Sequence, residues 1–288
     1  MPEQREAKHE LPTLPGAPRY PAGDEPSIPT VLPLPENGEQ PRSIGRAGQI
    51  ILDLQMGEFS IRPGPAGEPI RVEADYDAGK FVLEENFVTD ENGGWTYEVS
   101  FGGDGGWLGL LLGGGTSNVN NRIELIIPRD HPVDILGKVG LGELEADLGG
   151  LLIRHVDLEF GAGDHFVEFR DPLPYPMETF RAESSVGSVE VRSLGDASPR
   201  TVEVDHNIGE LFLDLKGAWQ NNAEVDVDFG IGECRLWLPD DVHIDMQRAD
   251  VSIGESRIDR QSPRPVPEDA PTLELSMRGN IGEVRVEY

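Results

Sequence analysis

The sequence predicts an all-β fold, a β-solenoid similar to a right-handed parallel β-helix, with coils of about 22 residues. Three observations support this prediction. A glycine recurs at that spacing, apolar residues alternate with polar ones on both sides of it, and the composition favours turns. The 35 glycines and 24 prolines among 288 residues favour many short strands over long helices.

The repeat is centred on a glycine that follows an apolar residue and precedes an acidic or small one. From Gly142 to Gly282 the successive spacings are 21, 24, 22, 23, 22 and 28 residues. The series comprises Gly57, Gly142, Gly163, Gly187, Gly209, Gly232, Gly254 and Gly282, with Gly79 as a weaker copy. A period of this size indicates coils that bury their apolar faces by stacking on one another.

Apolar residues alternate with polar ones on both sides of each glycine. Val202 and Val204 precede Gly209, and Leu211 and Leu213 follow it. A period of two predicts two half-buried strands per coil. Because the alternation shifts by one across the glycine, the chain must bend there, which suits a residue without a Cβ.

The first 48 residues differ from the rest. Prolines recur every two to six positions from Pro12 to Pro41, and few large apolar residues accompany them. Residues 1–48 are therefore expected to be a disordered, partly polyproline-II tail that acts as a linker or as a ligand for an aromatic groove. The solenoid is expected over 49–288, as one unit or as two halves, about 49–150 and 151–288.

The net charge of −29 limits the classes of partner. It disfavours nucleic acid and anionic lipid, and it favours cations or basic proteins. No 18-residue apolar stretch predicts a transmembrane helix, and Met1–Glu10 is too polar for a signal peptide. A cytoplasmic location is the default expectation. The alternative is the cell envelope, reached through a partner or an anchor, with peripheral membrane association left open.

Several motifs resemble the toast-rack superfamily. Gly137–Phe169 carries Val-Gly-Leu-Gly-Glu-Leu and later Phe-Gly-Ala-Gly-Asp, and the segments beginning at Asn207 and Gly230 carry further Ile-Gly-Glu motifs. That superfamily includes the C-terminal domain of LiaF-type cell-wall-antibiotic response proteins and the "putative adhesin" domains. The resemblance, over roughly 50–288, implies a β-solenoid with a non-enzymatic role linked to envelope stress, and it supplies no catalytic residues. This chain lacks the transmembrane segments that often accompany such domains.

Outward positions of the repeat form two acidic rows. The first lies four residues before the glycine and is expected to stack an acid on an acid over five consecutive coils: Glu159, Glu183, Asp205, Asp228 and Asp250. Carboxylate oxygens suit a divalent cation such as calcium, so the row is a candidate for that cofactor or for a basic partner; otherwise it is a solvated face. The second row directly follows the glycine, and Arg235, Arg257 and Arg285 beside it predict a surface ion-pair network.

Two further segments are candidates for contact with a partner or a membrane. Gly102–Gly115 interrupts the repeat with an apolar run that either caps the solenoid or forms an exposed tip: Trp107, Leu108, Leu110, Leu111 and Leu112. The last coil, Leu273–Tyr288, is expected to be a sheet edge that pairs with another copy or a partner, with Val286 and Tyr288 at that edge.

No catalytic constellation appears in the sequence. Carboxylates recur in every coil rather than gathering once, as glycosidic cleavage would need. His165 and His206 fall on inward positions, where a hydrogen-bonded structural histidine is favoured over a ligand, and Cys234, the only cysteine, is expected in the core. The sequence thus favours a non-enzymatic interaction or scaffold module. The alternatives are a self-assembling structural solenoid and a polysaccharide-active β-helix enzyme.

Overall fold

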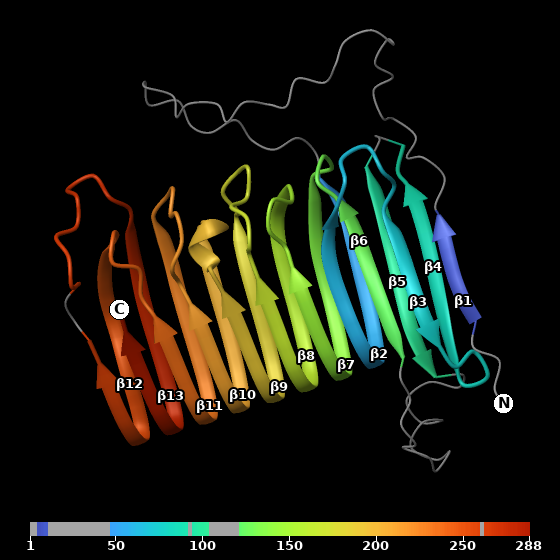
Figure 1. Cartoon of the computed structure of the whole chain (residues 1–288). Coiled ribbons are helices and arrows are strands. Elements are labelled where there is room, and N and C mark those ends of the chain that lie inside the picture. The colour runs from blue at the N-terminus through green and yellow to red at the C-terminus, as the bar shows by residue number, and fades with distance from the viewer. Residues whose placement is uncertain (1–4, 11–46, 92–93, 104–120, 260–261) are drawn as a thin grey trace, which may run out of the picture.

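The computed structural model describes residues 5–10, 47–91, 94–103, 121–259 and 262–288. It confirms the all-β solenoid: thirteen strands form one sheet, and the single helical element in the described residues is the 3-10 turn η1, Leu194–Asp196 (Figure 1). The strands are β1 (Arg5–Glu10), β2 (Gly48–Gly64), β3 (Arg71–Tyr76), β4 (Phe81–Thr89), β5 (Trp95–Gly103), β6 (Arg122–Pro128), β7 (Val133–Asp147), β8 (Ile153–Glu168), β9 (Thr179–Arg192), β10 (Thr201–Asp214), β11 (Ala223–Trp237), β12 (His243–Ile258) and β13 (Thr272–Glu287).

The long strands β2 and β7–β13 are the coils of the solenoid. They pair in parallel with their glycines in register, as Gly57 with Gly142 and Gly209 with Gly232. Each coil is one strand that bends at its glycine, so the predicted two strands per coil are the two arms of a single bent strand. The order in space is β2-β7-β8-β9-β10-β11-β13-β12, seen as side-by-side ribbons in Figure 1.

The corner requires glycine for two reasons. Gly209 has a φ of 134° and Gly232 a φ of 142°, values that side chains with a Cβ rarely adopt. A Cβ on Gly209 would also lie 1.8 Å from the carbonyl oxygen of Gly187 in the neighbouring coil. The glycines therefore form a ladder in which each one makes room for the carbonyl of the next.

The core fills the inside of the bend. Val204 and Leu211, on the two arms of β10, are buried, and so are Leu215 and Trp219 in the connection to β11. The indole Nε1 of Trp219 donates a hydrogen bond to the Leu215 carbonyl at 2.7 Å, which satisfies its polar atom inside the core. One hydrophobic cluster runs through all the coils, so each coil depends on its neighbours for burial.

The coil prediction is wrong around Gly79. That glycine lies in the turn between β3 and β4, where its N–H donates to Asp77. The end of the solenoid splits instead: β5 extends the first arm of β2 and β6 extends the second, while β4 and β3 pair antiparallel outside them. Phe101 packs there against Phe59 and Phe81, so aromatic side chains fill the end of the core.

The predicted tail is wrong in one part. Arg5–Glu10, expected to be disordered, forms β1 and pairs antiparallel with β3. The remaining proline-rich segment, 11–46, lies outside the described residues, and so do Trp107, Leu108, Leu110, Leu111 and Leu112. The sheet itself is continuous across position 150, because β7 pairs along its length with β8.

The predicted edge at the last coil is also wrong. β13 lies between β11 and β12, so Val286 pairs with Leu236 on one side and Ile258 on the other, and its side chain is buried. Tyr288 is partly buried against the core. The edge strand is β12. The 28-residue spacing before Gly282 reflects the longer connection after β12, which is long enough for the chain to return and insert β13 between β11 and β12.

Candidate interaction surface

The first acidic row has fewer neighbouring acids in the structure than the sequence predicts. The strand register orders its positions as Asp53, Lys138, Glu159, Glu183, Asp205, Asp228, Arg278 and Asp250. Four acids are direct neighbours, but Arg278 separates Asp228 from Asp250. The expected run of five stacked acids is therefore a run of four, because β13 inserts between β11 and β12.

Arginine and lysine side chains pair with several acids of this row. Lys138 Nζ lies 2.7 Å from Glu159, and Arg278 makes two contacts of 2.5 Å to the carboxylate of Asp228. Arg248 binds Asp250 at 2.7 Å. Within the described part of the chain, Asp205 has no ion-pair or hydrogen-bond partner for its carboxylate. Asp53, at the β2 end, likewise has no such partner among the described residues, whereas Glu183 lies 3.9 Å from Arg181. The acids of the row without a partner are therefore Asp53 and Asp205 in the described ranges.

The second acidic row confirms part of the predicted ion-pair network. Its positions in spatial order are Glu58, Glu143, Asp164, Ser188, Glu210, Glu233, Glu283 and Glu255. Arg235 lies 2.7 Å from Glu233 and lowers its pKa, and Arg285 lies 2.8 Å from Glu283. Across the residues that the structure covers, Glu143, Asp164, Glu210 and Glu255 have no such partner.

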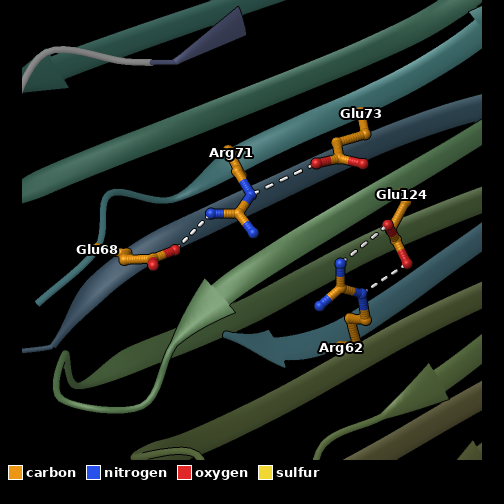
Figure 2. Close-up of polar contacts among 5 residues, drawn as sticks. All are labelled: Arg62, Glu68, Arg71, Glu73 and Glu124. Carbon is orange, nitrogen blue, oxygen red and sulfur yellow. Dashed lines mark hydrogen bonds and ion pairs between the residues drawn. The ribbon is translucent and has the colours of Figure 1, made fainter. Parts of the chain in front are cut away.

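Several acids on and near β3 and β6 are paired. Figure 2 shows the guanidinium of Arg62 on β2 facing both carboxylate oxygens of Glu124 on β6, at 2.7 and 3.2 Å. Arg71 lies between Glu68 and Glu73, at 2.5 and 3.6 Å. Within the described residues, the acids of the two rows that have no ion-pair partner lie on β2, β7, β8, β10 and β12.

A shallow concavity of about 480 Å³ borders the second row on β2, β7, β8 and β9. Its lining includes Glu143, Glu145, Asp164 and Phe166. These carboxylates occupy positions of the repeat that recur along the sheet, so they are not particular to the concavity. In the described ranges, no group of three or more His, Cys, Asp or Glu side chains is arranged to hold a metal ion.

The inward histidines are buried without hydrogen bonds. His165 and His206 are 2% and 3% exposed, and neither ring has a hydrogen-bond partner among the described residues, so the expected hydrogen-bonded role is wrong. His165 stacks on Phe160 with a centroid distance of 4.1 Å. Burial lowers its pKa to about 4, against the opposing charge of Asp164, and burial also lowers the pKa of His206.

Cys234 lies in the core, as predicted. Its side chain is fully buried, and burial raises the pKa of the thiol to about 12. The thiolate needed for nucleophilic attack is therefore scarce at neutral pH. Where the structure describes the chain, it has no helix with the length and apolar content to span a membrane.

The sequence interpretation missed one surface, the residues directly before the corner glycines. They lie on the outside of the bend, where Ile208 and Ile231 are 47% and 49% exposed. In spatial order the residues are Met56, Leu141, Ala162, Val186, Ile208, Ile231, Ile281 and Ile253, and we call them the corner ridge. The sequence did contain a signal for this surface, namely the shift in the apolar alternation across the glycine. Such a shift means that one apolar residue beside it cannot point into the core.

Asp205 and Asp228 are expected to respond oppositely to neutralisation. Asp205→Asn removes a like charge between Glu183 and Asp228 and should stabilise the fold at low salt by about 0.5 kcal/mol. Asp228→Asn breaks the two contacts with Arg278 and should destabilise it by a similar amount. Thermal melts at low and high ionic strength measure both. Equal shifts of the melting temperature in the two variants would contradict this account of the first acidic row.

The cation prediction is tested by calcium at matched ionic strength. A specific site in the row should raise the melting temperature in millimolar calcium chloride beyond the rise in sodium chloride, by binding linkage. Asp205→Asn should abolish that extra rise. The same response to both salts would leave a solvated acidic face.

Comparisons with known proteins identify no relative by sequence. No family model matches the chain, and no curated protein matches it. Among solved structures, a "putative cell adhesion protein" from Clostridium sporogenes is similar, with 15% identity, a TM-score of 0.41, and coverage of 84% of this chain and 92% of the other. A "putative adhesin" from Parabacteroides distasonis is similar with 15% identity, a TM-score of 0.29, and coverage of 84% and 94%.

Proposed function

We propose that this chain is a non-enzymatic interaction module that presents rows of carboxylates to a basic protein partner. The observation that carries the proposal is Asp205, which lies between Glu183 and Asp228 and has no partner among the described residues, on a stack of coils that share one core. Charges in a fixed row create a field that attracts cationic partners and repels nucleic acid. The net charge of −29 supports the same class of partner.

The cell envelope is the proposed place of action. The support is the likeness of Gly137–Phe169, and of the Ile-Gly-Glu motifs at Asn207 and Gly230, to toast-rack domains linked to envelope stress. In that setting the chain would act as a scaffold, at the membrane surface through a partner or at the cell surface.

Crosslinking in the native cell, followed by affinity capture, tests the proposal. Wild type should recover a basic protein whose yield falls with added salt. The double variant Glu183→Gln, Asp205→Asn should recover much less of it, whereas Glu84→Gln, outside both rows, should recover as much as wild type. Recovery that is unchanged by the double variant, or no recovered protein, would contradict the proposal.

Self-association is a second candidate, favoured by the edge at β12. In the described ranges this strand pairs with β13 alone, and its inward residues Met246 and Val251 stay partly exposed. An edge with exposed apolar groups can pair with another chain. Light scattering should then show a mass that rises with concentration and that Val251→Lys suppresses. A monomer at all concentrations would exclude this candidate.

A further inference from the structure

The corner ridge is an uninterrupted apolar line along the outside of the solenoid. The register places Ile208 beside Ile231, Ile231 beside Ile281, and Ile281 beside Ile253. Neighbouring strands lie about 4.8 Å apart, so eight coils extend the ridge over about 34 Å. The larger side chains are half exposed: Leu141 50%, Val186 46%, Ile208 47%, Ile231 49%, Ile281 44% and Ile253 64%.

Folding alone does not account for the ridge. Met56 at the β2 end packs partly against the core. The other ridge side chains point away from it, because the inward positions lie three residues before and two residues after each glycine. Strand propensity would be satisfied by threonine, which is also β-branched and suits solvent. All eight ridge positions nevertheless carry apolar residues. A contiguous exposed apolar surface of this kind marks a binding site.

Acidic rows flank the ridge on both sides. The second acidic row follows the ridge by two residues, and the first acidic row precedes it by three. Within the part of the chain that the structure describes, Glu143 and Glu210 of the second row and Asp205 of the first have no ion-pair partner. Of the two residues between the first row and the ridge, the first points inward and the second is small or uncharged: Gln55, Gly140, Gly161, Ser185, Asn207, Gly230, Asn280 and Ser252. The surface therefore has an apolar centre and two negative margins.

We infer that the corner ridge and its two acidic rows bind a basic amphipathic helix, with the apolar face of the helix along the ridge and its Lys or Arg side chains on both margins. The inference rests on the proposed function and names the partner's chemistry. Turns of a helix repeat every 5.4 Å, close to the spacing of about 4.8 Å between coils, whereas same-face residues of an extended strand repeat every ~6.8 Å. A helix of about 22 residues spans the ridge. The negative charge disfavours a second copy of this chain or an anionic bilayer.

A synthetic helical peptide of about 22 residues, with leucines on one face and lysines flanking them, is the probe. Fluorescence anisotropy should show that the full chain binds it and that salt weakens the binding. The double variant Ile208→Asn, Ile231→Asn should weaken it at least about tenfold, since two apolar contacts are lost. The matched control is Val82→Asn, Val88→Asn, whose valines are 43% and 50% exposed on β4, away from the ridge, and it should bind as wild type does.

Two further measurements separate this inference from simple charge attraction and from misfolding. A peptide with the same composition and no apolar face should bind at least about tenfold more weakly. Glu143→Gln and Glu210→Gln, which leave the core untouched, should reduce the salt dependence of binding. Melting temperatures of all the variants show whether the fold is retained.

Three outcomes would overturn the inference: equal binding of the two peptides, ridge variants that bind as wild type while folded, or anionic vesicles or a second copy that compete for the ridge. The proposed function is tested separately. If the peptide fails to bind but the native partner is still lost from the Glu183→Gln, Asp205→Asn variant, the ridge inference fails and the interaction module stands.

Discussion

Gly209→Ala is expected to destabilise the fold by roughly 2–5 kcal/mol, through backbone strain together with overpacking. The φ of 134° is strained for alanine, and the new Cβ would lie 1.8 Å from the carbonyl oxygen of Gly187. That oxygen belongs to the backbone of the next coil, so relief requires the two coils to move apart. Because neighbouring coils share the core, the coils on both sides of the substitution should lose stability.

Gly79→Ala is the matched control for the corner. Its Cβ would lie 3.2 Å from a flexible carboxylate oxygen of Asp77, in a turn outside the coils. The free energy of unfolding is expected to change by no more than about 0.5 kcal/mol. Denaturant midpoints followed by circular dichroism measure both variants. A Gly209→Ala protein as stable as Gly79→Ala would show that the coils do not meet at their glycines.

His165 should make the fold less stable as pH falls from about 6.5 toward 4. Burial lowers the folded-state pKa to about 4, so the unfolded chain binds a proton in this range that the folded chain does not. Stability therefore rises with pH across the window and falls as acid is added. The expected loss is on the order of 2 kcal/mol, at about 1.4 kcal/mol for each pKa unit and allowing for partial relaxation around the ring.

Replacing the ring with an apolar side chain should remove this dependence. His165→Leu places leucine between Leu144 and Val189, its neighbours in the inward column, so the variant should be at least as stable as wild type at pH 7. Its stability should also fall less between pH 6.5 and 4.5. His155→Asn, a half-buried histidine on the same strand, controls for the loss of a histidine elsewhere. An unchanged pH profile in His165→Leu would show that the ring reaches solvent.

Local repetition made the solenoid predictable. Each coil carries its glycine and its alternating apolar residues within about 22 positions, so the period, the bend and most of the core could be deduced without a structure. The inward positions of Cys234, His165 and His206 could be predicted in the same way, from their distance in sequence to the corner glycine. The two acidic rows followed as well, because parallel coils in register convert sequence positions into columns.

Long-range pairing was not predictable from the repeat. The order of β13 and β12 depends on which neighbour a coil meets after a long connection, and the alternation is the same for either order. Because β13 lies between β11 and β12, Arg278 lies within the first acidic row and Val286 is buried. The shift in alternation indicates that an apolar position beside the glycine leaves the core, but the exposure of Ile208 also depends on which side of the bend faces the core. The split end around Phe101 depends on aromatic packing between distant segments.

Disulfide trapping at the corner ridge tests the stacking of the coils most directly. Two cysteines on adjacent parallel strands can meet the Cα separation of roughly 4.4–6.8 Å that a disulfide needs. Under mild oxidation the pair Ile231→Cys, Ile281→Cys should crosslink within one chain, whereas Ile231→Cys, Ile253→Cys should stay reduced because β13 lies between β11 and β12. The buried thiol of Cys234, with its raised pKa, should take no part. A disulfide in the second pair and none in the first would show that the coils stack in chain order. The interrupted acidic row and the order Ile231, Ile281, Ile253 along the corner ridge would then be wrong.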